Sequence, residues 1–172
     1  MIVVLTTTFV FAAVPSMAQR QVQYAVSGTF AAEGKTVYLI DELTEKAIDS
    51  VVVADGKFVF AGTADKDALM AVQAKKKNWM TQFFNDGTPV NINLNDSTLK
   101  GSPLNERLAK LDVERDLPRR QMNMKMANMT EADFKAHQDE LVDEINNVIS
   151  AELAFANKVF KEERHSLIPV AF

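Results

Sequence analysis

The sequence contains no cysteine in its 172 residues. A chain without cysteine forms no disulfide and performs no thiol chemistry, so its stability must come from packing. Clustered positive charge is also scarce, because 19 Lys and Arg stand against 23 Asp and Glu, and the net charge is −4. Proteins that bind nucleic acids neutralise phosphates with clustered Lys and Arg, so this composition argues against such a partner. The three lysines at 75–77 are typical of a solvated turn between strands, with a site for an anionic ligand as the alternative.

Catalytic motifs are missing as well. The sequence has no Gly-x-Ser-x-Gly elbow, no glycine-rich phosphate loop and no carboxylate pair typical of glycosidases. His137 and His165 have no partner at a spacing that would identify a catalytic site. We therefore predict no catalytic residue and no cofactor, and we favour a binding role over an enzymatic one.

An uncharged apolar run opens the chain at residues 2–14, and small residues follow at Ser16 and Ala18. The run is shorter than the roughly 20 residues needed to span a bilayer, and the small residues suit a signal peptidase. We predict that residues 1–18 are a signal peptide and that the mature protein is periplasmic or extracellular. The lack of a basic residue ahead of the run suggests a start upstream of Met1. No cysteine is available for lipid attachment, so membrane insertion after cleavage is not expected; a buried core helix is the alternative interpretation.

The period of the apolar residues changes near Gly101. This change divides the mature chain into a β-rich domain at 19–101 and a helical segment at 102–172. In the first part apolar residues alternate with polar ones, as at 22–30 and 88–94, and strands are also expected at 68–74 and 79–84. We predict an α+β protein in which an antiparallel β-sandwich, or a barrel-like sheet, precedes two helices.

Two hairpins are predicted within the β-rich domain. The first turns at Glu-Gly 33–34. The second turns at Asp-Gly 55–56, where a type I′ turn requires positive φ at both positions. Pairing across the second turn would place Val53 opposite Phe58.

Beyond position 101 the apolar residues recur at helical spacing. Leu104, Leu108 and Leu111 predict a first helix that stops or kinks at Pro118. Proline removes a backbone donor and clashes with the preceding turn, which is why the helix should change there.

A longer helix is predicted from about Thr130 to Arg164, with Thr130 and Asp133 forming a capping box at its start. Its apolar stripe consists of Phe134, Leu141, Ile145, Val148, Phe155 and Val159, and is widened by Val142, Ile149, Leu153 and Phe160. A stripe this wide must be covered by the first helix, by the sheet or by a second copy of the chain. We expect its C-terminal half, near Phe155 and Phe160, to be the exposed part.

Three stretches carry a resemblance to a known family: GKTVYLID at 34–41, IDSVVVADGKFVFAG at 48–62 and GSPLNERL at 101–108. They resemble the N-terminal domain of unknown function that precedes thioredoxin-like modules in Bacteroidetes envelope proteins, the thiol:disulfide interchange and peroxiredoxin-like group. The resemblance covers roughly residues 24–102. Such proteins continue into a thioredoxin fold bearing Cys-x-x-Cys, whereas this chain ends about where that module would begin and has no cysteine. The resemblance therefore implies an accessory domain, either truncated or stand-alone, whose family redox activity maps to no residue here.

Four methionines lie close together at Met122, Met124, Met126 and Met129. Thioether sulfur is a soft ligand that selects Cu(I), so a Met-rich periplasmic Cu(I)-binding protein is the alternative function. The favoured interpretation is that these flexible side chains fill irregular space where the helix breaks, or face a partner.

A second candidate metal site consists of Asp133, His137, Glu140 and Glu144, which would lie on adjacent turns of one helix. A charged, solvated helix face is the favoured interpretation of this group.

Two short stretches, at 49–51 and 96–98, fit the Asp-Ser/Thr pattern of O-glycosylation in the envelope proteins that the chain resembles. Ser50 is expected within a strand, whereas Ser97 is expected in a loop that a transferase can reach. Ser97 is therefore the predicted site of O-glycosylation.

The function that the sequence favours is a non-catalytic extracytoplasmic accessory module that binds or positions a partner. The expected partner is a thioredoxin-like module or another envelope protein, with a homodimer through the long helix as a further possibility.

Overall fold

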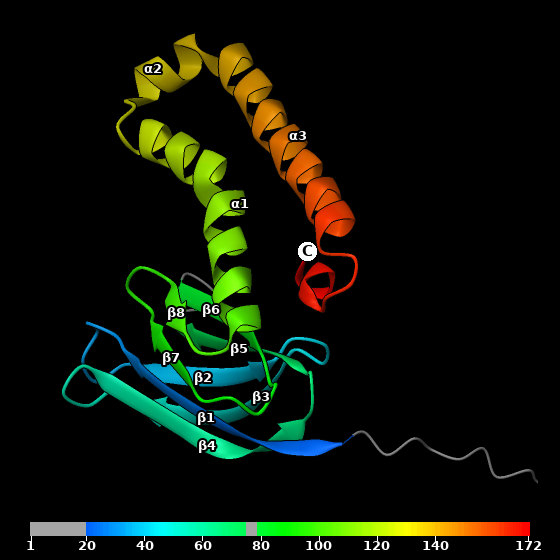
Figure 1. Cartoon of the computed structure of the whole chain (residues 1–172). Coiled ribbons are helices and arrows are strands. Elements are labelled where there is room, and N and C mark those ends of the chain that lie inside the picture. Colours follow the sequence, from blue (N-terminus) through cyan, green and yellow to red (C-terminus); the bar gives the residue numbers. More distant parts are fainter. Residues whose placement is uncertain (1–19, 75–78) are drawn as a thin grey trace, which may run out of the picture.

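The computed structural model describes residues 20–74 and 79–172. The predicted signal peptide at 1–18 and the lysine run at 75–77 lie outside these residues. Within the described residues the strands come first and the helices follow (Figure 1). The strands are β1 (Gln21–Thr29), β2 (Thr36–Asp41), β3 (Lys46–Val52), β4 (Lys57–Asp65), β5 (Leu69–Ala74), β6 (Trp79–Phe84), β7 (Val90–Asn93) and β8 (Thr98–Lys100). The helices are α1 (Pro103–Ala127), α2 (Glu131–Ala136), α3 (Gln138–Glu162) and the 3₁₀ helix η1 (Ile168–Ala171).

The strands form two four-stranded sheets that pack face to face as a sandwich (Figure 1). One sheet has the order β4-β1-β7-β8 and the other has the order β3-β2-β5-β6. Neighbouring strands are antiparallel, except that β1 and β7 run parallel. The predicted α+β fold with a β-sandwich is therefore confirmed, whereas the barrel alternative is wrong because the sheets do not close.

The core lies between the two sheets and collects side chains from both. The alternation predicted for 22–30 is confirmed, since Tyr24, Val26 and Phe30 of this segment are buried. Gly28 lies on the same inward face, and a Cβ at this position would lie 2.2 Å from the Phe58 ring. The absence of a side chain at Gly28 thus makes room for a large aromatic side chain from β4.

The turn at Asp55 and Gly56 forms as predicted, but the hairpin does not. Both residues have positive φ, at 52° and 67°, and Ala54 and Lys57 exchange backbone hydrogen bonds of 3.0 and 3.1 Å across the turn. Beyond the turn the strands separate, because β3 pairs with β2 in one sheet and β4 pairs with β1 in the other.

The predicted pairing of Val53 with Phe58 is therefore wrong. The Val53 amide instead donates to the Lys35 carbonyl at 2.9 Å. The turn at 33–34 behaves in the same way, since β1 and β2 belong to different sheets. A strand can bury its inward residues against either sheet of a sandwich, so alternation alone does not identify the strand with which it pairs.

The helices form an arm that rises from the sandwich and folds back on itself (Figure 1). The prediction that the first helix could stop at Pro118 is wrong, because α1 continues to Ala127. Its axis bends partway along, which agrees with the predicted kink (Figure 1). Contacts with α3 on both sides of Pro118 stabilise the continuous helix, from Leu111 near its base to Lys125 near its end. No helix in the described part of the chain is both long and apolar enough to span a bilayer.

The long helix predicted from 130 to 164 is divided in two at His137, which has φ −116° and ψ 23°. The capping box of Thr130 and Asp133 is confirmed, but it starts the short helix α2 rather than the long one. The helical segment thus holds three α-helices and not the predicted two. The division has a geometric reason, since α2 turns the chain so that α3 can run back along α1 (Figure 1).

The arm is anchored to the sandwich through Asn105 on the first turn of α1. This residue is 0% exposed, and its amide group makes both hydrogen bonds of a strand neighbour to Phe84 of β6. The Phe84 amide donates to Asn105 Oδ1 at 2.7 Å, and Asn105 Nδ2 donates to the Phe84 carbonyl at 2.9 Å. Ser102 caps the helix by accepting a hydrogen bond from the Asn105 amide at 3.3 Å.

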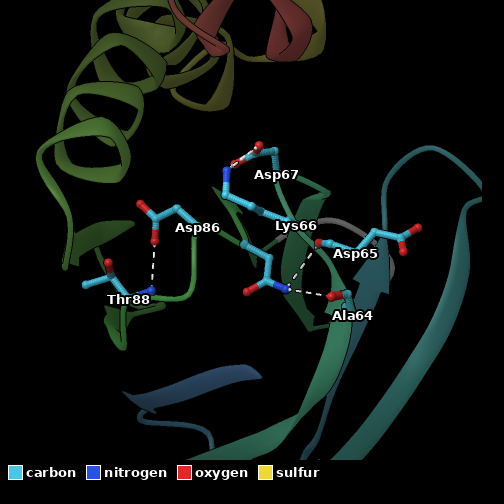
Figure 2. A network of polar contacts seen from close by, with 7 residues as sticks. Ala64, Asp65, Lys66, Asp67, Asp86 and Thr88 are labelled. Carbon is cyan, nitrogen blue, oxygen red and sulfur yellow. Dashed lines mark hydrogen bonds and ion pairs between the residues drawn. The ribbon is translucent and has the colours of Figure 1, made fainter. Parts of the chain in front are cut away.

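A second buried amide, Asn85, ties the segment after β6 to the end of β4. Its Nδ2 donates to the carbonyls of Ala64 at 3.3 Å and Asp65 at 3.2 Å (Figure 2). Lys66 and Asp67 form an ion pair of 2.6 Å beside it. These contacts satisfy backbone carbonyls that leave the sheet, so the network is part of the scaffold.

Candidate functional site

An apolar stripe runs along the solvent side of α3. It consists of Val142, Ile149, Leu153 and Phe160, and we call these four residues the outer stripe. Their exposed fractions are 50%, 51%, 66% and 50%, respectively. They occupy one line along the helix, because each is separated from the next by four or seven residues. Contiguous apolar residues on a surface mark an interaction site more often than isolated ones do.

The adjacent side of α3 packs against α1 and η1. Leu141, Val148 and Val159 are buried there, and Phe155 is half-buried against the Phe172 ring, with the ring centroids 6.0 Å apart. The predicted stripe thus divides into a covered part and the outer stripe. Phe134 is the exception, because it lies on α2 and is 45% exposed.

The expected exposure of the C-terminal half of the stripe is therefore correct for Phe160 and wrong for Phe155. Phe172 at the carboxyl terminus packs against Phe155, whereas Phe160 is half exposed. The exposed residues extend along the whole helix rather than over one half.

Ion pairs hold α3 beside α1. Arg119 binds Glu152 through two hydrogen bonds of 2.5 and 2.6 Å, and Lys125 binds Glu144 at 2.6 Å. The hydrogen bonds from Arg119 lower the pKa of Glu152 below its ordinary value. These pairs orient α3, so they decide which of its apolar residues face solvent.

A polar pocket of about 150 Å³ lies between α1 and β6. Two of its lining side chains carry buried oxygens without a hydrogen-bond partner among the described residues, Thr81 Oγ1 and Asp112 Oδ1. Asp112 Oδ1 lies 3.0 Å from Arg115 Nη2, but not in hydrogen-bonding geometry. Burial raises the pKa of Asp112 to about 6, against the lowering effect of Arg115. A pocket of this size and polarity accommodates water molecules that bridge such groups.

Sequence reasoning missed this pocket and the Asn105 anchor. A signal existed, because Asn105, Leu108, Ala109 and Asp112 follow the spacing of a single helix face and all four lie towards the sandwich or the pocket. Two polar residues on an otherwise apolar face indicate buried hydrogen bonding rather than solvation.

Three of the four methionines of the proposed Cu(I) site lie on two different sides of α1. Met122 and Met126 are half-buried, whereas Met124 is 61% exposed. Side chains two residues apart on a helix point in nearly opposite directions, so Met124 cannot share an ion with the other two in one copy. Met129 lies beyond the helix, in a pocket with Lys125, Asn128 and His137.

The second candidate metal group is divided by its own contacts. Asp133, His137 and Glu140 line the pocket near Met129, but Glu144 is paired with Lys125. His137 Nδ1 lies 2.9 Å from the Asp133 carbonyl. Among the described residues, no group of three or more His, Asp or Glu side chains is arranged to hold a metal ion.

Ser97 lies in the turn between β7 and β8, which is consistent with the predicted loop. It has a φ of 61°, it is half-buried, and it lines pockets beside α1. Asp96 holds the turn by accepting hydrogen bonds from the amide and hydroxyl of Thr98 at 2.9 and 2.7 Å. Ser50 is exposed and lies within β3, as predicted.

Residues 24–108 match the family described as "Domain of unknown function (DUF4369)". The match covers the sandwich from β1 onward and ends within the first turns of α1. It agrees with the part of the resemblance that concerns a domain of unknown function. No curated protein matches the chain.

Proposed function

We propose that this protein is a non-catalytic accessory module, exported from the cytoplasm, that binds a protein partner through its helical arm. The observation that carries the proposal is the outer stripe of α3. Its four residues are at least half exposed while the neighbouring face of the same helix is buried against α1. Leaving such a stripe in water is unfavourable by about 25 cal/mol for each Å² that a partner would cover.

Export is part of the proposal for two reasons. The apolar run at 2–14 with small residues at Ser16 and Ala18 is a secretory pattern, and the chain resembles envelope proteins. That resemblance supports a role for the module beside thioredoxin-like domains.

The fold supports a positioning role. Asn105 fixes the base of α1 to β6, and ion pairs fix α3 to α1, so the outer stripe is presented at a defined place relative to the sandwich. An anchored surface of this kind binds a partner without a large cost in conformational entropy.

The test is site-specific photo-crosslinking in cells that produce the full chain. A photoreactive residue at Leu153 is expected to crosslink an envelope protein, whereas the same residue at Asn147, an exposed polar position of α3, is expected not to. The crosslinked partner is identified by mass spectrometry, and the amino terminus is sequenced to locate the cut. Intact chain in the cytoplasm, with residues 1–18 retained and no crosslink from Leu153, would contradict the proposal.

A further inference from the structure

We propose that the outer stripe pairs with the outer stripe of a second copy of this chain, with the two α3 helices antiparallel. This inference rests on the proposed role of the arm in partner binding and names the partner. The order of residues along the stripe, the charges beside it and the position of the sandwich carry the proposal.

The spacing of the outer stripe is the same when counted from either end. Its midpoint lies at the level of Ala151, with Ile149 and Leu153 two residues away on either side and Val142 and Phe160 nine residues away. A two-fold axis at this level places Val142 beside Phe160 of the second copy and Ile149 beside its Leu153. A large residue then faces a smaller one at each end, and all eight side chains lie in one contact about 27 Å long.

The spacing also places the four residues in an arc of about 40° on the helix surface, which is the width of a two-helix contact. Asn146 and the small residue Ala156 lie just outside this arc, one on each side of it, and are again at equal distances from the midpoint. The small side chain of Ala156 lets the two helices approach.

Charge beside the stripe favours the antiparallel direction. Asp143 near one end and Lys161 near the other are exposed on the same flank of α3, and neither forms an ion pair within the described residues. In the antiparallel pair the two-fold axis is perpendicular to both helices, so this flank lies on the same side of the pair in both copies. Asp143 of one copy therefore lies within about 3 Å, measured along the helix axis, of the level of Lys161 of the other. Parallel pairing would instead put the two Asp143 side chains, and likewise the two Lys161 side chains, on opposite flanks of the pair, where neither charge meets an opposite one.

The position of the sandwich leads to the same arrangement. α3 runs back towards the sandwich, so its last turns are nearest to it and its first turns are at the far end of the arm (Figure 1). Antiparallel pairing therefore places the two sandwiches at opposite ends of the helix pair. Parallel pairing would bring both sandwiches to the same end, where they would compete for space.

The first experiment uses the absence of cysteine, which makes every introduced thiol unique. Chains carrying Val142→Cys and Phe160→Cys are purified, mixed and treated with a mild oxidant. The expected product is the mixed disulfide, because a disulfide needs Cα atoms about 4.4–6.8 Å apart and equal positions are about 27 Å apart in the antiparallel pair. Disulfides between two Val142→Cys chains, at a higher yield than the mixed product, would overturn the antiparallel arrangement.

The second experiment is sedimentation equilibrium between about 1 and 100 µM. The wild type is expected to associate reversibly, and Leu153→Asp to raise the dissociation constant about tenfold or more. Asp143→Lys alone and Lys161→Asp alone are each expected to weaken association several-fold, and a mixture of the two variants, or the double variant, to restore it. Circular dichroism of each variant checks that the fold is retained.

Unchanged association in both charge variants would overturn the pairing, and so would a wild type that is monomeric over the whole concentration range. The outcome for the proposed function is separate. A monomeric chain that crosslinks a different envelope protein from Leu153 would overturn the second copy as partner and leave the accessory role standing. A dimer formed by a chain that stays in the cytoplasm would support the pairing of two copies and overturn the exported accessory role.

Discussion

The sandwich and the helical arm bury their apolar residues in different ways. In the sandwich the inward side chains of two sheets meet, so residues such as Phe58, Phe60 and Ile92 are covered on all sides. In the arm two helices lie side by side, and in the described part of the chain α1 and η1 cover one side of α3, whose apolar surface is wider than that side. The comparison shows that apolar residues are enclosed in a core when two sheets face each other, and stay partly exposed when a helix is covered on one side.

The two regions also differ in what determines their geometry. Backbone hydrogen bonds between strands align the sandwich, whereas side-chain ion pairs such as Arg119–Glu152 align the arm. Exposed ion pairs are worth about 0–1 kcal/mol each, so the arm is the region more easily changed by salt or mutation.

The largest expected effect separates the cores. Phe58→Ala is expected to lower the free energy of unfolding by about 3–5 kcal/mol, because it leaves a cavity between the sheets. Phe160→Ala in the arm is expected to change it by about 0.5 kcal/mol or less. Chemical denaturation at a concentration where the chain is monomeric measures both. An equal loss at Phe160 would mean that the outer stripe is covered within one copy.

The junction between the regions is the next test. Asn105→Ala is expected to cost about 2–4 kcal/mol, since it leaves the Phe84 amide and carbonyl without partners in a buried place. Hydrogen exchange should become faster in the first turns of α1 and at β6. Asn157→Ala, at an exposed position of α3, is the matched control. If exchange at α1 were unchanged in Asn105→Ala, the anchor would lie elsewhere.

The pH dependence of stability tests the pocket beside α1. The pKa of Asp112 is raised to about 6 in the folded state, from an unfolded value near 4. Between these values the unfolded chain releases the proton first, so stability falls as pH rises from about 4 to 6, by up to about 3 kcal/mol. Asp112→Asn should remove this component. Wild type and variant are compared by denaturation across that window. If the stability of both proteins fell equally with pH, the buried carboxyl of Asp112 would not be the source of the fall.

The smallest expected effect concerns the turn that sends β3 and β4 to different sheets. Gly56 has φ 67°, so Gly56→Val is expected to cost about 1 kcal/mol or more, while Gly56→Asn should cost less because asparagine tolerates positive φ. Thermal or chemical midpoints show the difference. Equal losses in the two variants would indicate that side-chain size matters more than backbone conformation there.

Much of the local structure was predictable from the residues. Alternation identified β1 and β7, Asp-Gly identified the turn at 55–56, and the Thr130 and Asp133 pair identified a helix start. Each of these signals acts over a few residues, so it does not depend on the rest of the chain. The strand with which each strand pairs was not predictable. The inward residues of β3 and β4 are buried equally well whether the two strands pair in one sheet or lie in two facing sheets.

The candidate site was predictable in part. All four residues of the outer stripe were recognised as apolar positions of a long helix, but their exposure depends on how α3 is turned against α1. That orientation comes from distant contacts, such as Lys125 with Glu144 and Phe155 with Phe172. The pocket of Thr81 and Asp112 also joins residues from β6 and α1 that no local pattern connects.

By itself the sequence determined the division at Gly101, the periods of the two regions and the absence of thiol chemistry, since these follow from residue type and short-range spacing. Only the tertiary structure decided which strands pair, where the helical segment breaks and which side of α3 meets solvent. These outcomes depend on contacts between residues far apart in the chain, where several arrangements satisfy the same apolar pattern and packing selects one. The outer stripe is a consequence of that selection, because α1 covers one side of α3 and leaves the side with the four symmetrically spaced apolar residues exposed.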